Sequence, residues 1–259
     1  MPNTFGDVTV DLGDDLVAEV EIHRPPNNFF DIALIRSLAD AYEHLDGTGC
    51  RAVVLCAEGK HFCAGADFGG QSDAEALPES GAASLYREAV RLFRARIPVV
   101  AAVQGAAIGG GLGLACSADF RVAAPEARFA ANFARLGFHH GFGLTVTLPR
   151  IVGQQYALEL LYTGRRVGGE EAAARGLADR LVALADVRPA ARAFAGEIAA
   201  SAPLAVRSIR ETMRGGLAAE VDRATDREDA EQIRLRSTGD FAEGIRASLE
   251  RREPRFTGR

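Results

Sequence analysis

The 259-residue chain has no tryptophan, and aromatic residues make up only 7% of it. A hydrophobic core must therefore be built mainly from Ala, Val, Leu and Ile. Cysteine is scarce as well: Cys50, Cys56, Cys63 and Cys116 form no Cys-x-x-Cys pair, and only five histidines accompany them. These spacings argue against a metal site or a disulfide framework. They favour reduced thiols in a cytoplasmic protein.

The sequence also lacks a large excess of charge of either sign. Its 30 Lys and Arg against 35 Asp and Glu give a net charge of −5, so we expect no nucleic-acid partner. The N-terminal residues are acidic and alternating, unlike a secretory signal peptide. The uncharged stretch from Ile97 to Ala118 is long enough to cross a bilayer, but it contains Pro98, Gln104 and five glycines. We therefore expect no membrane span.

Strand and helix patterns alternate through the first half of the chain. Alternating or continuous apolar runs predict strands at 8–12, 17–22, 52–56, 99–103 and 120–123. Apolar residues at three- and four-residue spacing predict helices over 32–45 and 85–93. This alternation predicts an α/β core with right-handed crossovers. After about residue 145 the pattern changes, and only helices are expected.

The glycine-rich turn from Gly105 to Gly113 follows a predicted strand and opens an apolar helix. Turns of this kind aim backbone N–H groups at an anion. A dinucleotide fingerprint fails because Leu114 stands where the third glycine after Gly109 belongs, and a phosphate loop would need Gly-Lys-Ser/Thr. Two interpretations remain: an oxyanion hole for a carbonyl oxygen, or glycines that let the helix pack closely on the strand.

Three blocks together resemble the crotonase family, the enoyl-CoA hydratase/isomerase superfamily. They are Gly59-Lys-His-Phe-Cys-Ala-Gly-Ala-Asp67, Pro98-Val-Val-Ala-Ala-Val-Gln-Gly-Ala-Ala-Ile-Gly-Gly-Gly111 and Thr163-Gly-Arg-Arg-Val-Gly-Gly-Glu-Glu-Ala-Ala-Ala-Arg-Gly-Leu177. The terminal segment 251–259 also resembles the family's tail. The resemblance implies a spiral of ββα units over residues 1–195. It also implies a helical C-terminal region over 196–259 that forms a homotrimer or a dimer of trimers.

The same resemblance implies an acyl-CoA thioester as substrate, with no tightly bound cofactor and coenzyme A present only as part of the thioester. Alignment of the blocks places the two oxyanion-hole N–H groups at Ala66 and Gly110. A helix N-terminus at Gly110 suits a developing enolate, which agrees with the local interpretation of the turn. Further residues aligned with coenzyme A contacts are Pro26, Asn27, Phe29, Ala64, Phe68, Arg255, Phe256 and Arg259.

The acids that the family uses for hydration are absent. The two glutamate positions hold Gly113 and Phe133, and a third acidic position holds Gly141. Because general acid–base assistance contributes about 10²–10⁴ per group, ordinary hydration of 2-enoyl-CoA is not expected. His139 and His140 adjoin the third position, so they are the candidate base.

We therefore expect an acyl-CoA enzyme that stabilises a thioester enolate, with isomerase, hydrolase or lyase chemistry favoured over hydration. A non-catalytic acyl-CoA-binding homologue is the alternative. A scaffold with a vestigial pocket is disfavoured by the retained Ala-Gly-Ala-Asp and triple-glycine motifs.

Overall fold

The computed structural model describes residues 3–67 and 83–259. Its main sheet has seven strands in the order β1-β2-β3-β4-β5-β7-β10. The first three strands pair antiparallel, and the strands from β3 onward run parallel. These strands are β1 (Asn3–Phe5), β2 (Val8–Leu12), β3 (Val17–Ile22), β4 (Ala52–Ala57), β5 (Val99–Val103), β7 (Phe120–Ala123) and β10 (Arg180–Leu181).

A second, three-stranded sheet holds the glycine-rich turn. It consists of β6 (Ala106–Ile108), β8 (Arg128–Ala130) and β9 (Arg166–Gly168), with β6 parallel to β8 and β8 antiparallel to β9. Cys63 forms an isolated parallel bridge to Ala107. This bridge joins the loop that carries Ala66 to the strand that leads into Gly110.

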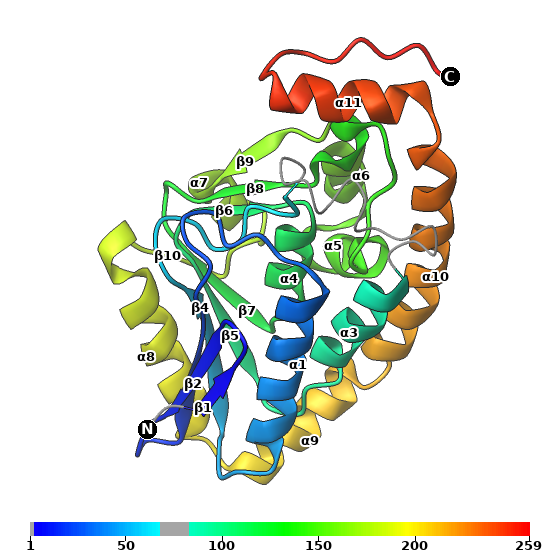
Figure 1. The fold of residues 1–259 in the computed structure, drawn as a ribbon. Coiled ribbons are helices and arrows are strands. Elements are labelled where there is room, and N and C mark those ends of the chain that lie inside the picture. Colours follow the sequence, from blue (N-terminus) through cyan, green and yellow to red (C-terminus); the bar gives the residue numbers. More distant parts are fainter. Residues whose placement is uncertain (1–2, 68–82) are drawn as a thin grey trace.

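Helices cover both faces of the main sheet (Figure 1). On one face lies α8 (Val187–Ala199), which contacts β3, β4, β5 and β7. On the other face lie α1 (Ile32–Asp46), α3 (Ala83–Phe93) and α4 (Gly110–Ser117). The parallel strands β4 and β5 are buried along their whole length, which explains their continuous apolar sequences.

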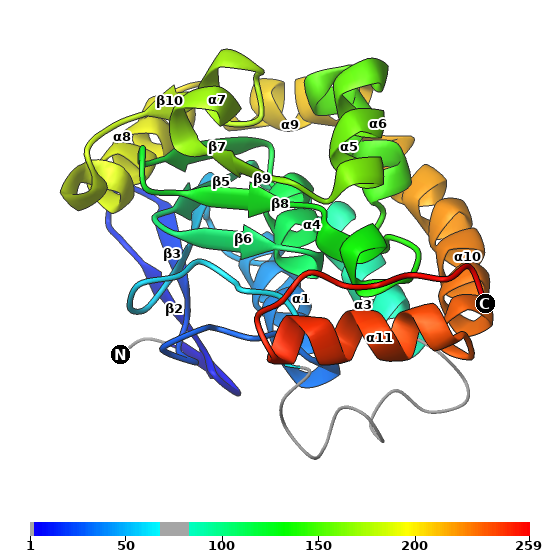
Figure 2. The same ribbon diagram turned by 90° about the horizontal axis from the view of Figure 1, so that it is seen from above.

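The last third of the chain is helical and wraps around this core (Figure 2). A long helix, α10 (Leu217–Arg236), runs from α9 (Pro203–Arg214) to α11 (Gly239–Leu249) and packs on α3. The remaining elements are the 3₁₀ turns η1 (Asn132–Leu136) and η2 (Leu184–Asp186) and the helices α5 (Leu144–Val152), α6 (Gln154–Thr163) and α7 (Gly169–Ala174).

The expectation of helices alone after residue 145 is wrong, because β9 and β10 lie in that region. The glycine-rich turn also contains the strand β6, which the sequence analysis treated as part of the turn. These strands have two or three residues, too few for a periodic pattern. The predicted boundary between residues 195 and 196 falls inside α8. Among the described residues, no helix is both long and apolar enough to cross a membrane.

Candidate active site

The three consecutive glycines at the start of α4 each have a separate structural reason. Gly109 has a φ of 57°, in the left-handed region that glycine adopts without a steric penalty. A Cβ on Gly110 would lie 2.2 Å from the ring of Phe30, and a Cβ on Gly111 would lie 2.1 Å from the carbonyl oxygen of Cys63. Glycine therefore lets α4 approach the Cys63–Ala66 loop more closely than any other residue would.

Ala66 and Gly110 line one cavity of about 310 Å³. Gly110 is the first residue of α4, where a backbone N–H has no intrahelical partner. Among the described residues, neither the Ala66 N–H nor the Gly110 N–H donates to a backbone or side-chain acceptor. The structure thus brings the two predicted donors to one cavity and leaves both free to bind an oxygen atom, as an oxyanion hole requires.

Aromatic side chains occupy the places of the two missing glutamates. A Cβ on Gly113 would lie 2.6 Å from the Cβ of Phe142, so the Phe142 side chain fills this position. Phe142 has a φ of 61°, which is strained for a non-glycine residue, and its ring packs edge-on against Phe30 at 5.8 Å. Phe133 lines the cavity itself and packs on Phe138. Neither position offers a group that could hold or deprotonate a water molecule.

A tyrosine hydroxyl occupies the place of the third acid. A Cβ on Gly141 would lie 1.8 Å from Oη of Tyr86, so a side chain at position 141 would displace that hydroxyl. Tyr86 comes from α3, lines the cavity and is 5% exposed. Burial is the main cause that raises the pKa of Tyr86 above its usual range, and the Glu228 carboxylate adds to it. The phenol is therefore neutral at physiological pH and able to donate a proton.

Two side chains of α10 surround this hydroxyl. The amide of Gln232 donates to the carbonyl oxygen of His139 at 2.9 Å, and its contact with the Tyr86 hydroxyl lowers the pKa of that phenol. Its Oε1 accepts from Nη2 of Arg236 at 3.1 Å. Gln232 and Arg236 both line the cavity.

Comparison with known proteins agrees with this geometry. Residues 13–259 match the family model described as "Enoyl-CoA hydratase/isomerase". The chain is 38% identical over 228 residues to a putative enoyl-CoA hydratase of Thermus thermophilus, covering 85% of this chain and 88% of that protein. It is 37% identical to a crotonyl-CoA hydratase of Syntrophomonas wolfei over 76% of each chain.

The chain belongs to the enoyl-CoA hydratase/isomerase (crotonase) family.

The fold agrees as well. A crystal structure of an enoyl-CoA hydratase/isomerase from Pseudoalteromonas atlantica superposes with a TM-score of 0.86 at 31% identity, covering 97% of this chain and all of that one. The α/β crotonase fold with C-terminal helices, expected from the resemblance, is thereby confirmed.

The two histidines proposed as the base of this crotonase lie outside the cavity lining. His140 donates from Nε2 to Oγ1 of Thr145 at 2.8 Å, because the Thr145 hydroxyl itself donates to Glu228. His139 stacks on His140 and donates from Nδ1 to the His140 carbonyl oxygen. Burial, together with His139, lowers the pKa of His140 to about 3. His140 is therefore too weak a base to take a proton from a substrate near neutral pH.

Glu228 anchors the histidine loop from behind. This residue is fully buried on α10, and it accepts bonds from the backbone N–H groups of Gly143 and Thr145 at 2.9 and 3.0 Å. Burial raises its pKa. The histidines and Glu228 form a hydrogen-bonded layer that holds Gly141 against Tyr86, which is a structural arrangement outside the cavity.

The residues predicted to contact coenzyme A are divided between two places. Phe29 and Ala64 line the oxyanion cavity, and Asn27 accepts from the Ala64 N–H at 2.9 Å through its carbonyl oxygen. Pro26 follows a cis peptide bond in the same loop. Phe68 lies outside the described residues. Arg255, Phe256 and Arg259 lie in the C-terminal tail, where the carbonyl oxygen of Arg259 accepts from the Asp240 N–H and Arg255 borders a separate cavity.

An arginine-rich cavity of about 840 Å³ adjoins the oxyanion cavity and shares Ile108, Asn132, Leu136 and Ser248 with it. Its five arginines are Arg135, Arg165, Arg166, Arg251 and Arg252. Three of these form ion pairs with glutamates, whereas Arg166 and Arg251 have none among the described residues. Sequence analysis missed this cluster because its members come from three separate parts of the chain.

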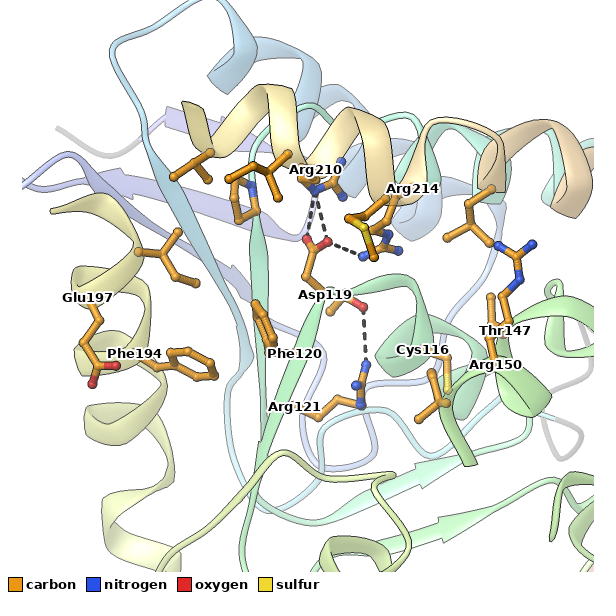
Figure 3. Close-up of a pocket in the computed structure, with 18 of the residues that line it drawn as sticks. Cys116, Asp119, Phe120, Arg121, Thr147, Arg150, Phe194, Glu197, Arg210 and Arg214 are labelled. Carbon is orange, nitrogen blue, oxygen red and sulfur yellow. Dashed lines mark hydrogen bonds and ion pairs between the residues drawn. The ribbon is translucent and has the colours of Figure 1, made fainter. Parts of the chain in front are cut away.

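A further cavity, of about 630 Å³, lies between α8, α9 and the start of β7 (Figure 3). Its charged groups pair with one another: Asp119 accepts from Nε of Arg210 at 3.1 Å and also pairs with Arg214. Phe120 and Phe194 line it, with their rings tilted against each other at a centroid distance of 4.7 Å. None of the predicted oxyanion-hole, base or coenzyme A residues lines this cavity, and both of its carboxylates have a cationic partner.

Within residues 3–67 and 83–259, no group of three or more His, Cys, Asp or Glu side chains could hold a metal ion. The four cysteines are free and buried, and burial raises their thiol pKa values. None of them is a reactive thiolate.

Proposed function

We propose that this crotonase is an acyl-CoA enzyme that binds a thioester oxygen between the Ala66 and Gly110 N–H groups and stabilises an enolate there. The observation that carries the proposal is the presence of two free backbone donors at one cavity with otherwise largely apolar walls. In such surroundings each donor typically contributes about 10²–10³ in turnover.

Tyr86 is the proposed proton donor to the enolate carbon. A phenol with a raised pKa gives up a proton to a carbanion but is a poor base at neutral pH. This favours lyase chemistry, in which the bond from Cα to an oxygen-bearing carbon breaks, that carbon leaves as carbon dioxide or as a carbonyl compound, and the electron pair of the bond enters the thioester enolate. Tyr86 then protonates Cα, and water returns the proton to the phenolate. Isomerase and hydrolase chemistry both need a base.

A second candidate uses Asp67, which also lines the cavity, as the base of an isomerase. A third is a non-catalytic acyl-CoA-binding protein, which the loss of acids at Gly113, Phe133 and Gly141 favours. The same assays separate all three.

The arginine-rich cavity is the proposed site for the coenzyme A phosphates. Arg166 and Arg251 lack acidic partners, and the cavity shares walls with the oxyanion cavity, so one long anionic ligand could occupy both. Arg251→Ala should weaken binding of butyryl-CoA several-fold and reduce its salt dependence. Arg234→Ala, a change at an exposed arginine paired with Glu231, should leave both unchanged.

The deciding experiment is a mass-spectrometric screen of acyl-CoA thioesters, run in D₂O beside a crotonyl-CoA hydration assay. We expect a hydration turnover well below roughly 10 s⁻¹. A thioester that is cleaved should yield a product with one deuterium at Cα. Tyr86→Phe should slow this step about 10²-fold or more without loss of binding, while the exposed control Tyr162→Phe does not.

Other outcomes identify the other candidates. Loss of turnover in Asp67→Asn but not in Tyr86→Phe would favour the isomerase. Tight thioester binding without any turnover would support the third candidate, the non-catalytic acyl-CoA-binding protein. Hydration of crotonyl-CoA at 10 s⁻¹ or more would contradict the proposal.

We also propose a homo-oligomer, a trimer or a dimer of trimers, formed through α9. No residue of this amphipathic helix is buried, and Ile209 and Met213 are 64% and 77% exposed beside the cavity of Figure 3. Light scattering should report an oligomer at micromolar concentration. Ile209→Glu combined with Met213→Glu should dissociate it, whereas Leu204→Glu, on the opposite side of the helix, should not. A monomeric wild type would contradict the proposal.

A further inference from the structure

We infer that the acyl group of the substrate carries a carboxylate, which binds Arg236 at the end of the oxyanion cavity beside Tyr86. The substrate class is thus the CoA thioester of a dicarboxylic acid. This inference rests on the proposed function, because it assumes that the thioester oxygen binds at Ala66 and Gly110.

Arg236 is a cation without an ion-pair partner among the described residues, and it lines the cavity. Its Nε–H is buried and has no hydrogen-bond partner, and within residues 3–67 and 83–259 the side-chain bond of its guanidinium is the donation from Nη2 to Gln232. Burial lowers the pKa of the guanidinium, and Asp229 and Tyr86 are the groups whose charges offset that effect. A buried charge without a partner is costly, and an anionic ligand would compensate it.

The neighbours of Arg236 also suit a carboxylate. The guanidinium of Arg236 offers N–H donors to a carboxylate at the cavity that Tyr86 also lines. The Tyr86 O–H stays available for its proposed role as the proton donor to Cα. The facing walls are the apolar side chains of Phe133, Phe138 and Phe142, which offer no competing donor.

The coenzyme A phosphates are not the partner of Arg236. The arginine-rich cavity does not include this residue, and the wall that Arg236 shares with Tyr86 belongs to the oxyanion cavity. Asp67, a carboxylate that lines the same cavity, would repel a second carboxylate beside it. The anionic end of the acyl group is therefore expected at the Arg236 side of the cavity.

The test compares thioesters of the same shape with and without the charge. Calorimetry would measure Kd for malonyl-CoA against isovaleryl-CoA, and for succinyl-CoA against 4-methylpentanoyl-CoA, since an isopropyl end resembles a carboxylate in shape. We expect at least one carboxylate ligand to bind about tenfold to a hundredfold more tightly than its apolar partner. Arg236→Gln should remove that preference and leave the Kd of the apolar thioester within about threefold.

The matched control is Arg234→Gln, two residues earlier on α10, where the arginine is exposed and pairs with Glu231. Arg234→Gln should bind the carboxylate thioester as much more tightly than the apolar one as the wild type does. Arg236→Lys, which retains the charge, should keep part of this preference. It replaces Arg236→Gln in the test if that variant does not fold. Equal affinity of the wild type for the carboxylate and the apolar thioester of each pair would overturn the inference. So would an Arg236→Gln variant that loses the same factor in affinity for both thioesters of a pair. If the wild type binds none of the four thioesters, the proposed function itself fails.

Discussion

The cavity of Figure 3 and the oxyanion cavity differ in whether their polar groups have partners within the protein. In the cavity between α8 and α9, Asp119 pairs with Arg210 and Arg214, so its charges are satisfied within the protein (Figure 3). In the oxyanion cavity the Ala66 and Gly110 N–H groups lack partners among the described residues, and Arg236 lines the same cavity without an ion-pair partner among them. Buried polar groups are normally hydrogen-bonded, so donors left free at a cavity indicate a ligand. The larger cavity is therefore the structural one.

The largest expected effect comes from breaking the paired cavity. Asp119→Ala would leave two largely buried arginines without their carboxylate and would remove the acceptor of the Val99 N–H. The free energy of unfolding should fall by about 4 kcal/mol, measured by urea denaturation. Glu197→Ala, which breaks the exposed pair with Arg180, should cause little change. A small loss in Asp119→Ala would show that these charges do not stabilise the fold.

A somewhat smaller loss should follow from disturbing the oxyanion side. Gly111→Ala would place a methyl group against the carbonyl oxygen of Cys63 and push α4 away from the Ala66 loop. We expect about 3 kcal/mol of destabilisation together with weaker thioester binding. Gly196→Ala, inside α8 with open space at its Cβ, is the control and should be neutral or slightly stabilising. Normal stability in Gly111→Ala would contradict the close approach of the helix and the loop.

The histidine layer behind the oxyanion cavity should appear in the pH dependence of stability. The folded pKa of His140 is about 3, below the unfolded value of about 6.5, so the unfolded chain binds the proton more tightly. This contribution to stability is complete above pH 6.5 and is lost as the pH falls toward 3. It should amount to about 3 kcal/mol between pH 7 and pH 4.

His140→Gln should flatten the pH dependence over that range, as measured by denaturation at a series of pH values. His44→Gln, at an exposed position on α1, is the control. An unchanged profile in His140→Gln would mean that another group causes the acid sensitivity.

Much of the sheet could be predicted because its strands are buried on both faces. The apolar runs at β4 and β5 and the alternation at β2 and β3 are strong local signals. The Ala66 and Gly110 pair was also predictable, since each lies in a motif specific to the family. In contrast, β6 and β8 have three residues each, and neighbouring strands rather than their own sequence determine them.

The part of the oxyanion cavity lined by Tyr86 and Arg236 could not be predicted from local sequence. Tyr86 reaches the cavity because Gly141, 55 positions later, leaves room for its hydroxyl. Arg236 reaches it because α10 packs on α3. The histidines are the titratable residues next to the missing acid in the sequence. The Tyr86 hydroxyl, which occupies the place of that acid, comes from a distant part of the sequence and is brought there by the fold.

The most direct test of the central claim is the infrared spectrum of a bound thioester. Butyryl-CoA labelled with ¹³C at its thioester carbonyl is saturated, so it offers no double bond to hydrate. Two hydrogen bonds from the Ala66 and Gly110 N–H groups should polarise the carbonyl and shift its stretching band to lower frequency than in free butyryl-CoA. A bound ligand whose carbonyl band stays at the position found in water would contradict the account.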